Sequence, residues 1–209
     1  MTHVLHSVII SYNRRELTEQ ALTSYLETVT LPYTLVIVDN NSEEETREWI
    51  ARLPCAAILL PENKYPGFAC NRGWEKAPDG ATLLHRADND FRFLPGWCDE
   101  VVERFKQNPD LGQLGLRTDA EELYAPFNVG GNNVIRRELW DAGLRYQERP
   151  WTQYAPGYSE DSYMSPAVLN MGWQWGRVQR PCIESLASGD WNDPYYAASY
   201  GDRRIPRPD

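Results

Sequence analysis

The sequence lacks the features that would place it in a membrane or in the secretory pathway. None of its apolar runs approaches the roughly 20 residues that a membrane-spanning helix needs. Its start, MTHVLHSVII, has no basic region, long apolar stretch or small-residue cleavage site of a secretory signal. The four cysteines (Cys55, Cys70, Cys98 and Cys182) form no C-x-x-C pair. We therefore expect reduced thiols, no paired-cysteine metal or redox motif, and a cytoplasmic location.

Positive charge is also scarce. The formal net charge is −9 and the sequence pI is about 4.9, which argues against broad, non-specific binding to nucleic acid. Lys64, Lys76 and Lys106 are the only lysines among the 21 basic residues. Arginine suits bidentate phosphate recognition, but a GC-rich genome produces the same bias, and this explanation carries the greater weight.

The first part of the chain alternates strand and helix patterns. Strands are predicted over residues 4–12, 34–39, 55–60 and 81–88, and helices over 14–29, 42–53 and 67–77. Ser42 and Glu45 fit a capping box that opens the second helix. This alternation predicts an α/β fold with a mostly parallel sheet, and 209 residues suffice for one substantial core.

The second half is less regular. We expect a helix over residues 94–108 and a strand over 111–118, followed by a Gly-Gly turn, a short strand and a helix within 125–144. Glu160 and Asp161 begin a further helix, which Pro166 is predicted to interrupt, and a strand follows over 173–180. The tail from residue 188 has no clear periodicity and is either an ordered loop over the site or a floppy end.

Polar clusters follow three of the predicted strands. They read SYNRR after the first, DNNS at the end of the second and DND at the end of the fourth. Ligands of parallel α/β sheets bind beyond the carboxyl ends of the strands. The three clusters are therefore predicted to line one crevice.

Asp88 and Asp90 are the most informative of these residues. Side chains at i and i+2 of an extended chain point to the same side, and two like charges so close are unfavourable without a positive group between them. A divalent cation shared with substrate phosphates would supply it. The alternative is a solvated Asp-Asn-Asp turn.

The ordered motifs of the chain resemble those of family-2 glycosyltransferases with the GT-A fold. The resemblance runs from about Val4 to Trp173 through SVIISYNRRE, LVIVDNNSEEET, ENKYPGFACNRGW, RADNDFRFLPGW, VGGNNVIRREL and SEDSYMSPAVLNMGW. It implies a single GT-A domain over 1–209, with a Rossmann-like, mostly parallel central sheet flanked by helices. Its parts would be a nucleotide-sugar-binding half (about 1–93), an acceptor-side half (about 94–187) and a C-terminal tail that could act as a lid (188–209).

The resemblance also implies roles for individual residues. Asp39 would read the base of the donor, Asp90 would hold Mn²⁺ or Mg²⁺ together with Asp88, and Asp161 would be the general base with Glu160 beside it. The implied donor-binding residues are Ser11, Tyr12, Asn13, Arg14, Asp39, Asn71, Arg72, Asp88 and Asn89. The residues proposed for the acceptor side are Gly130, Gly131, Asn132, Trp151 and Tyr154.

The implied reaction is a metal-dependent, inverting transfer of a sugar from a nucleotide-diphosphate sugar to an acceptor hydroxyl. A UDP-sugar is the expected donor, and a saccharide or other glycan is the expected acceptor. Many relatives supply a late histidine as a further metal ligand, but the histidines here are His3, His6 and His85. Glu184, Asp190 or Asp193 could replace it, or Asp90, phosphate and water could suffice.

Two other functions stay open. The acceptor could be a hydroxymethylated base in DNA, as in phage-type modification, which would place the protein in the host cytoplasm. The candidate phosphate contacts would be Arg14, Arg15, Arg136, Arg137, Arg177, Arg180, Arg203 and Arg204, but the net acidity does not favour DNA. The chain could instead be a non-catalytic GT-A-like module that binds nucleotide or glycan, although such a module would have little need of Asp161. A nucleotidyltransferase is more distant, because the Gly-rich, Arg-containing first loop is missing after Tyr12.

Overall fold

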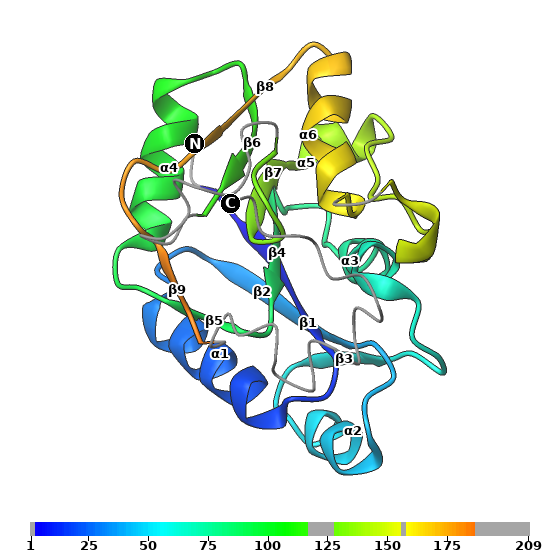
Figure 1. Cartoon of the computed structure of the whole chain (residues 1–209). Helices are drawn as coiled ribbons and strands as arrows, with labels where there is room; N and C mark the ends of the chain where they lie inside the picture. The colour runs from blue at the N-terminus through cyan, green and yellow to red at the C-terminus, as the bar shows by residue number, and fades with distance from the viewer. Residues whose placement is uncertain (1–2, 117–127, 156–157, 187–209) are drawn as a thin grey trace, which may run out of the picture.

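The computed structural model describes residues 3–116, 128–155 and 158–186, which form a three-layered α/β structure (Figure 1). Strands and helices alternate in the first part of the chain, as predicted. In order they are β1 (Leu5–Ser11), α1 (Arg15–Thr28), β2 (Tyr33–Asp39), α2 (Glu44–Ala51), β3 (Ala56–Leu59), α3 (Tyr65–Trp74), β4 (Leu83–Asp88) and β5 (Phe91–Phe93). Then come α4 (Trp97–Gln107), β6 (Leu111–Gly115), β7 (Asn133–Arg136), α5 (Arg137–Asp141), the 3₁₀ turn η2 (Trp151–Gln153), α6 (Glu160–Asn170), β8 (Gln174–Arg177) and β9 (Ile183–Ser185).

Seven strands form one sheet in the order β3-β2-β1-β4-β7-β6-β8. The pairs β3–β2, β2–β1, β1–β4 and β6–β8 are parallel, whereas β7 runs antiparallel to both β4 and β6. In this register Ser11 lies opposite Asp39 and Ile10 lies opposite Asp88. The carboxyl ends of β1, β2 and β4 therefore meet at one edge of the sheet, as the three polar clusters predicted.

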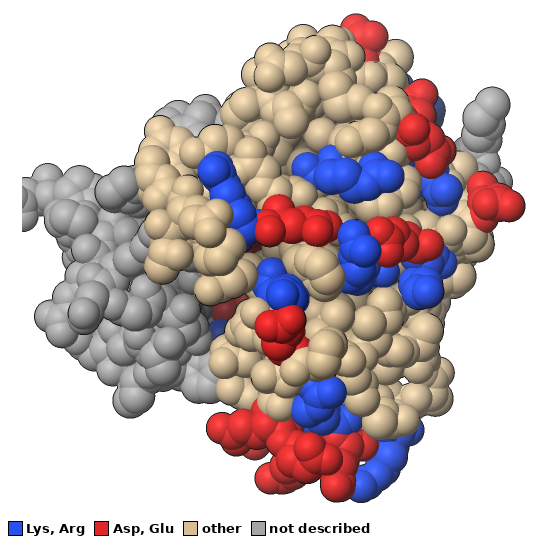
Figure 2. Space-filling model, turned by 90° about the vertical axis from the view of Figure 1, so that its right-hand side faces the viewer, with Lys and Arg blue, Asp and Glu red and all other residues tan. Residues whose placement is uncertain are grey.

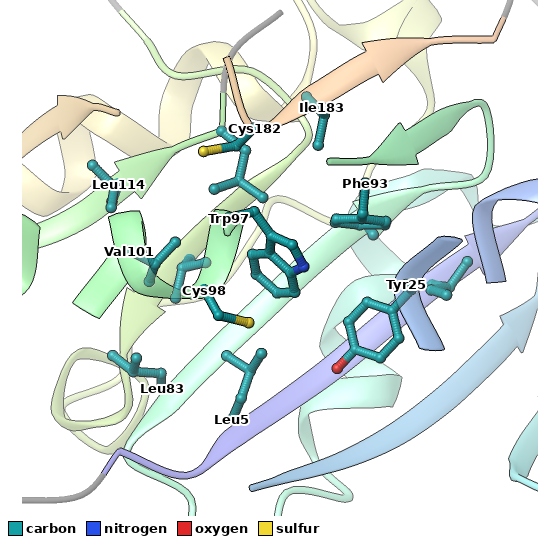
Figure 3. Close-up of a cluster of buried hydrophobic side chains, with 14 of the residues drawn as sticks. Leu5, Tyr25, Leu83, Phe93, Trp97, Cys98, Val101, Leu114, Cys182 and Ile183 are labelled. Carbon is teal, nitrogen blue, oxygen red and sulfur yellow. The ribbon is translucent and has the colours of Figure 1, made fainter. Parts of the chain in front are cut away.

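Helices α1 and α4 cover one face of the sheet, over an aromatic core. Trp97 lies in its middle, with ring centroids 5.2 Å from Phe93 and 5.8 Å from Tyr25 (Figure 3). Leu5 and Leu83 contribute from the strands. Burial of aromatic rings of this size is a large part of the stability of such a core.

Helices α3, α5 and α6 cover the other face (Figure 1). Strand β1 contributes Val8 and Ile10 to this second core, while its alternate residues face the first. Helix α3 approaches the sheet closely at Gly73, where a Cβ would come within 2.6 Å of the Val8 side chain. Both faces of the central strands are therefore covered, as expected for parallel strands.

Several details differ from the sequence-based predictions. The predicted capping box at Ser42 is absent: α2 has Glu43 at its N-cap and no side-chain cap. The capping box forms instead at α6, between Ser159 and Ser162. Pro166 does not interrupt α6, which continues to Asn170. Strands β5 and β9 form an additional two-stranded antiparallel sheet that was not predicted.

Within the described ranges, no helix combines the length and the apolar character required to cross a bilayer. The predicted tail, residues 188–209, lies outside the described residues. The predicted division near residue 93 stays a prediction, and both halves contribute strands to the seven-stranded sheet.

Candidate functional site

All four aspartates predicted for the site are paired with arginines. Asp39 is bound by Arg47 (2.8 Å), and Asp90 is bound by Arg14 (3.0 Å). Asp88 and Asp161 share a single arginine, Arg86, at 3.1 and 2.7 Å. The predicted positive partner of Asp88 and Asp90 was a metal ion, and no arginine was predicted beside any of the four. In the structure, the positive groups beside Asp88 and Asp90 are guanidinium groups.

Arg86 lies at the centre of the site. It is only 1% exposed, and its guanidinium also donates to Glu160 Oε1 at 2.9 Å. Nη1 faces Asp161, while Nε and Nη2 face Asp88 Oδ1. The ring of Tyr146 lies 4.8 Å from the guanidinium carbon. One cation therefore binds three carboxylates from two elements, β4 and α6.

The segment before β7 fits closely around Asp88. Asn132 accepts a hydrogen bond from the Asp88 backbone N–H through its side-chain oxygen (3.1 Å). A Cβ on Gly131 would overlap the Asp88 carboxylate and come within 3.2 Å of Arg86 Nη2. Asn133 donates to the backbone carbonyls of Gly130 and Gly131 and to the Tyr146 hydroxyl. Gly131 and Asn132, both predicted for the acceptor side, thus shape the surroundings of Asp88.

The loop after β1 brings Arg14 to Asp90. Asn13 and Arg14 both adopt left-handed backbone conformations, with φ of 51° and 50°. Asn13 is fixed on both sides, because its N–H donates to Ser42 Oγ and its Oδ1 accepts from the Glu43 N–H, each at 2.7 Å. Strained backbone of this kind persists only where its surroundings hold it. Tyr12, in the same loop, is half-buried.

The side chains of two predicted donor-binding residues form hydrogen bonds within the protein. The Ser11 hydroxyl is fully buried and lies 3.1 Å from Thr18 Oγ1. Asn89, 8% exposed, donates to the same Thr18 hydroxyl at 2.8 Å. These hydrogen bonds tie the end of β1 and the turn after β4 to helix α1, and Asp90 follows directly in that turn.

Asp39 is fully buried at the end of β2. It accepts hydrogen bonds from the Ser42 N–H and from Arg47, and Arg47 also donates to the Leu60 carbonyl. The predicted role of Asp39 in reading the base stays a prediction. Arg47, eight residues later on α2, was not predicted.

Asn71 and Arg72 hold the segment 146–148 against helix α3. The buried Asn71 side chain donates to the Tyr146 carbonyl and to Glu148, and it accepts from the Tyr146 N–H. Arg72 binds Glu148 (3.1 Å) and Glu75 (2.8 Å) at the surface. All the polar groups of the Asn71 amide are thus used by the fold, which explains its presence without a ligand.

Of the two predicted acceptor-side aromatic residues, Tyr154 does not present an open ring. Tyr154 is only 5% exposed, with Arg149 4.3 Å from its ring centroid. The side chain of Trp151 lies outside the described side chains. Tyr158, just before α6, is 44% exposed and was not predicted. Its ring centroid lies 6.1 Å from that of Tyr163 on α6.

The cluster around Arg86 contains three carboxyl groups and one guanidinium, so acidic groups outnumber the basic one. Burial raises the pKa of Asp161 to about 8, and the neighbouring carboxylates of Glu160 and Asp88 act in the same direction, against the opposing effect of Arg86. Burial acts to lower the pKa of Arg86, but the carboxylates outweigh it and raise this pKa above its usual value. The guanidinium therefore stays charged.

The carboxylates fit a divalent cation only if a substrate completes its coordination. No group of three or more metal-ligating side chains occurs within the described residues. Asp88 and Asp90 are hard oxygen donors, and Mg²⁺ typically uses one or two carboxylates together with substrate phosphates and water. Of the suggested replacements for a late histidine, Glu184 pairs with Arg92 (3.2 Å), whereas Asp190 and Asp193 lie outside the described residues.

Comparison with known proteins identifies the family of the chain. The model of the family "Glycosyl transferase family 2" matches residues 7–145. An uncharacterized glycosyltransferase, YwdF of Bacillus subtilis (strain 168), is 25% identical over 179 residues, covering 80% of this chain and 64% of its own.

Solved structures with the same fold include several glycosyltransferases. The mannosyltransferase PcManGT from Pyrobaculum calidifontis, in complex with GDP-Man and Mn²⁺, has a TM-score of 0.69 at 18% identity, over 90% of this chain and 58% of that one. TarS 1-349 of S. aureus, in complex with UDP-GlcNAc, has a TM-score of 0.68 at 14% identity, over 89% of this chain and 61% of that one. The predicted GT-A fold is thereby confirmed.

The chain spans less than two thirds of the length of these three proteins. The family match nevertheless covers most of the described sheet, from β1 through β7 and α5. It also includes Asp39, Asp88 and Asp90, the carboxylates at the ends of β2 and β4. The chain belongs to glycosyl transferase family 2.

Proposed function

We propose that the protein transfers a sugar from a nucleotide-diphosphate sugar to an acceptor hydroxyl, with inversion at the anomeric carbon. The observation that carries this proposal is the shared guanidinium of Arg86, which binds both Asp88, on the donor side, and Asp161, the candidate base. The two carboxylates that the reaction needs thus lie on either side of one fixed group. A glycan is the proposed acceptor.

The donor diphosphate is proposed to bind at the turn after β4. Asp90 and Asp88 would hold Mn²⁺ or Mg²⁺ there, and such an ion would act as a Lewis acid that stabilises the diphosphate leaving group. Arg14, which now binds Asp90, can also donate to phosphate oxygens. A UDP-sugar is the proposed donor, with Asp39 near the base. The similar structures carry GDP-Man and UDP-GlcNAc.

Asp161 is the proposed general base. It lies in the first turn of α6, and its side chain is 18% exposed. Only Oδ1 accepts a hydrogen bond from the described residues, that from Arg86, so Oδ2 is available for the proton of an acceptor hydroxyl. A raised pKa suits this task, because a base works best when its pKa lies near the working pH. Attack from the side opposite the leaving group inverts the anomeric carbon.

Thermal unfolding with nucleotides tests the donor site. Wild type and Asp90→Asn are melted with UDP, GDP, UDP-GlcNAc and GDP-mannose, with and without Mn²⁺. A ligand at a hundred times its Kd should stabilise the wild type by about 2.7 kcal/mol. We expect a Mn²⁺-dependent shift that Asp90→Asn loses. The matched control is Asp141→Asn, which removes a carboxylate from an exposed arginine pair on α5.

The outcomes separate the alternatives. A shift followed by release of UDP or GDP supports a transferase. A shift without any turnover would indicate the non-catalytic nucleotide-binding module. The absence of a shift with every nucleotide would contradict the proposed donor site.

A further inference from the structure

Arg86 is an unusual residue for its position. It lies inside a buried strand, between Leu84 and Asp88 on the face of β4 that packs against the second core. Its side chain is 2% exposed, so it is closed off from any substrate. An apolar residue would fill this position without the cost of desolvating a charge. The contacts of Arg86 must therefore explain why an arginine occupies this position.

Carboxylates bind the guanidinium of Arg86 from two sides. One side, Nη1, donates to Asp161 Oδ1 at 2.7 Å. The other side, Nε and Nη2, donates to Asp88 Oδ1 at 3.3 and 3.1 Å. Nη2 is also bound by the buried Glu160 (2.9 Å), and the Tyr146 ring packs on the guanidinium. Because the guanidinium is planar and rigid, it fixes the positions of the two carboxylates relative to each other.

We propose that Arg86 is a positioning residue that sets the separation and orientation of Asp88 and Asp161. This inference rests on the proposed function. By engaging only Oδ1 of Asp161, Arg86 orients the carboxylate and leaves Oδ2 directed to the acceptor. The role of Glu160 is then to hold the guanidinium through Nη2.

Lysine cannot replace this arrangement. Its single ammonium preserves the charge but offers no planar fork, so it cannot hold both carboxylates in one fixed geometry. A displacement of about 1 Å in a catalytic group can cost about a hundredfold in rate. We therefore expect Arg86→Lys to fold and to bind nucleotide while its turnover falls by about that factor.

The test compares Arg86→Lys with Arg136→Lys. Arg136 is a control of similar kind: a largely buried arginine of β7 that donates to the backbone carbonyls of Leu111, Phe105 and Pro109 and to no carboxylate of the site. For each variant we would measure the melting temperature, its shift with UDP or GDP and Mn²⁺, and the kcat and KM for UDP or GDP release. The donors are UDP-GlcNAc and GDP-mannose, with water or monosaccharides as acceptors.

A fall in kcat for Arg86→Lys, with KM for the donor and the nucleotide-induced shift retained, supports the proposal. Wild-type kcat per folded molecule in Arg86→Lys overturns it and leaves the proposed function intact. A wild type that neither binds nor turns over these donors would overturn the proposed function, and this inference with it. If Arg86→Lys does not fold, the double variant Arg86→Met with Glu160→Gln removes the buried charges together. The same loss of kcat is expected from it, and wild-type kcat would overturn the proposal.

Discussion

Arginine side chains hold every carboxylate of the candidate site. A buried or half-buried carboxylate is costly unless it is paired and hydrogen-bonded, and the fork of arginine satisfies both needs. Arg14, Arg47 and Arg86 each bind one or more of the predicted aspartates. The site is therefore ordered without a ligand, and its carboxylates are oriented before any donor arrives.

Replacement of Asp161 by Asn tests the base directly. The amide oxygen can still accept the hydrogen bond from Arg86, but the side chain can no longer take a proton. General base catalysis contributes about 10²- to 10⁴-fold, so kcat should fall by an amount within this range. The nucleotide-induced thermal shift should stay at its wild-type value. An Asp161→Asn protein with wild-type kcat would exclude Asp161 as the base.

Replacement of Gly131 by Ala tests the close fit around Asp88. The added Cβ would overlap the Asp88 carboxylate, so either the strand end or the loop must move. We expect a loss of about 1–3 kcal/mol in the free energy of unfolding, measured by urea unfolding. Gly80→Ala is the control, because nothing lies within 4 Å of a Cβ at that position. Equal behaviour of the two variants would contradict the expected overlap.

The sequence contained only part of the information about these residues. Arg86 and Asp88 are at i and i+2 of one strand, so their placement on one face could have been predicted from the strand pattern. The pairing of Arg86 with Asp161 joins residues 75 positions apart, and no local pattern reports such a contact. Asn71 was given a donor-binding role by resemblance, but its amide fastens the segment after α5.

Strand β4 connects two different environments. Its Arg86 faces the polar cluster, whereas the neighbouring His85 faces the aromatic core, with its ring 5.2 Å from Trp97 and 5.5 Å from Phe93. Nδ1 of His85 lies 3.0 Å from Ser7 Oγ, but Nε2 has no partner among the described residues. A protonated imidazole is strongly disfavoured there, and burial lowers the pKa of His85 to about 3.

The stability of the fold should therefore depend on pH through His85. Between pH 6.5 and about 3 the unfolded histidine binds a proton and the folded one does not. The free energy of unfolding consequently falls with decreasing pH, by about 1.4 kcal/mol per pH unit from this residue. Its contribution is complete above pH 6.5. Urea unfolding between pH 4.5 and 7.5 should show a shallower slope for His85→Gln than for wild type, and identical slopes would contradict the prediction.

Helix α6 is held at its start by the pair Ser159 and Ser162, which cap each other's backbone N–H groups. Ser159→Ala should lower the free energy of unfolding by about 1 kcal/mol, as measured by urea unfolding. Because Asp161 lies in the first turn, kcat should fall as well. Ser185→Ala, in the short strand β9, is a control outside this helix. An unchanged stability of Ser159→Ala would show that the cap contributes little.

At the level of elements, the predictions succeeded where periodicity was strong. The buried apolar runs of β1, β2 and β4 are typical of strands in a parallel sheet. Their bounds were therefore predicted to within a residue or two. The prediction that Pro166 interrupts α6 was wrong, because the other hydrogen bonds and the packing of α6 maintain the helix on both sides of the proline. Strands β5 and β9 have three residues each, which is too short for a hydrophobic periodicity to show in the sequence.

The charges of the whole molecule do not favour DNA as the acceptor. Figure 2 shows acidic and basic side chains alternating across the face that carries α3, with acidic ones gathered at the lower end, over α2. Glu43, Glu44, Glu45 and Glu48 are exposed in that segment. Several of the candidate phosphate contacts have partners within the protein: Arg15 with Glu45, Arg137 with Asp141 and Arg180 with Glu100. Arg203 and Arg204 lie outside the described residues.

Covering both faces of one sheet has a consequence for the exchange of backbone amide hydrogens with solvent. Strand β1 is buried along its whole length and is bonded to β2 and β4 on either side, whereas β3 is largely exposed at the sheet edge. Amides of β1 and β4 can open only when both cores separate, which is global unfolding. In hydrogen–deuterium exchange these two strands should share one slow rate that matches the global stability, while β3 exchanges much faster. Fast exchange in β1 would mean that one helical layer can detach while the other stays folded.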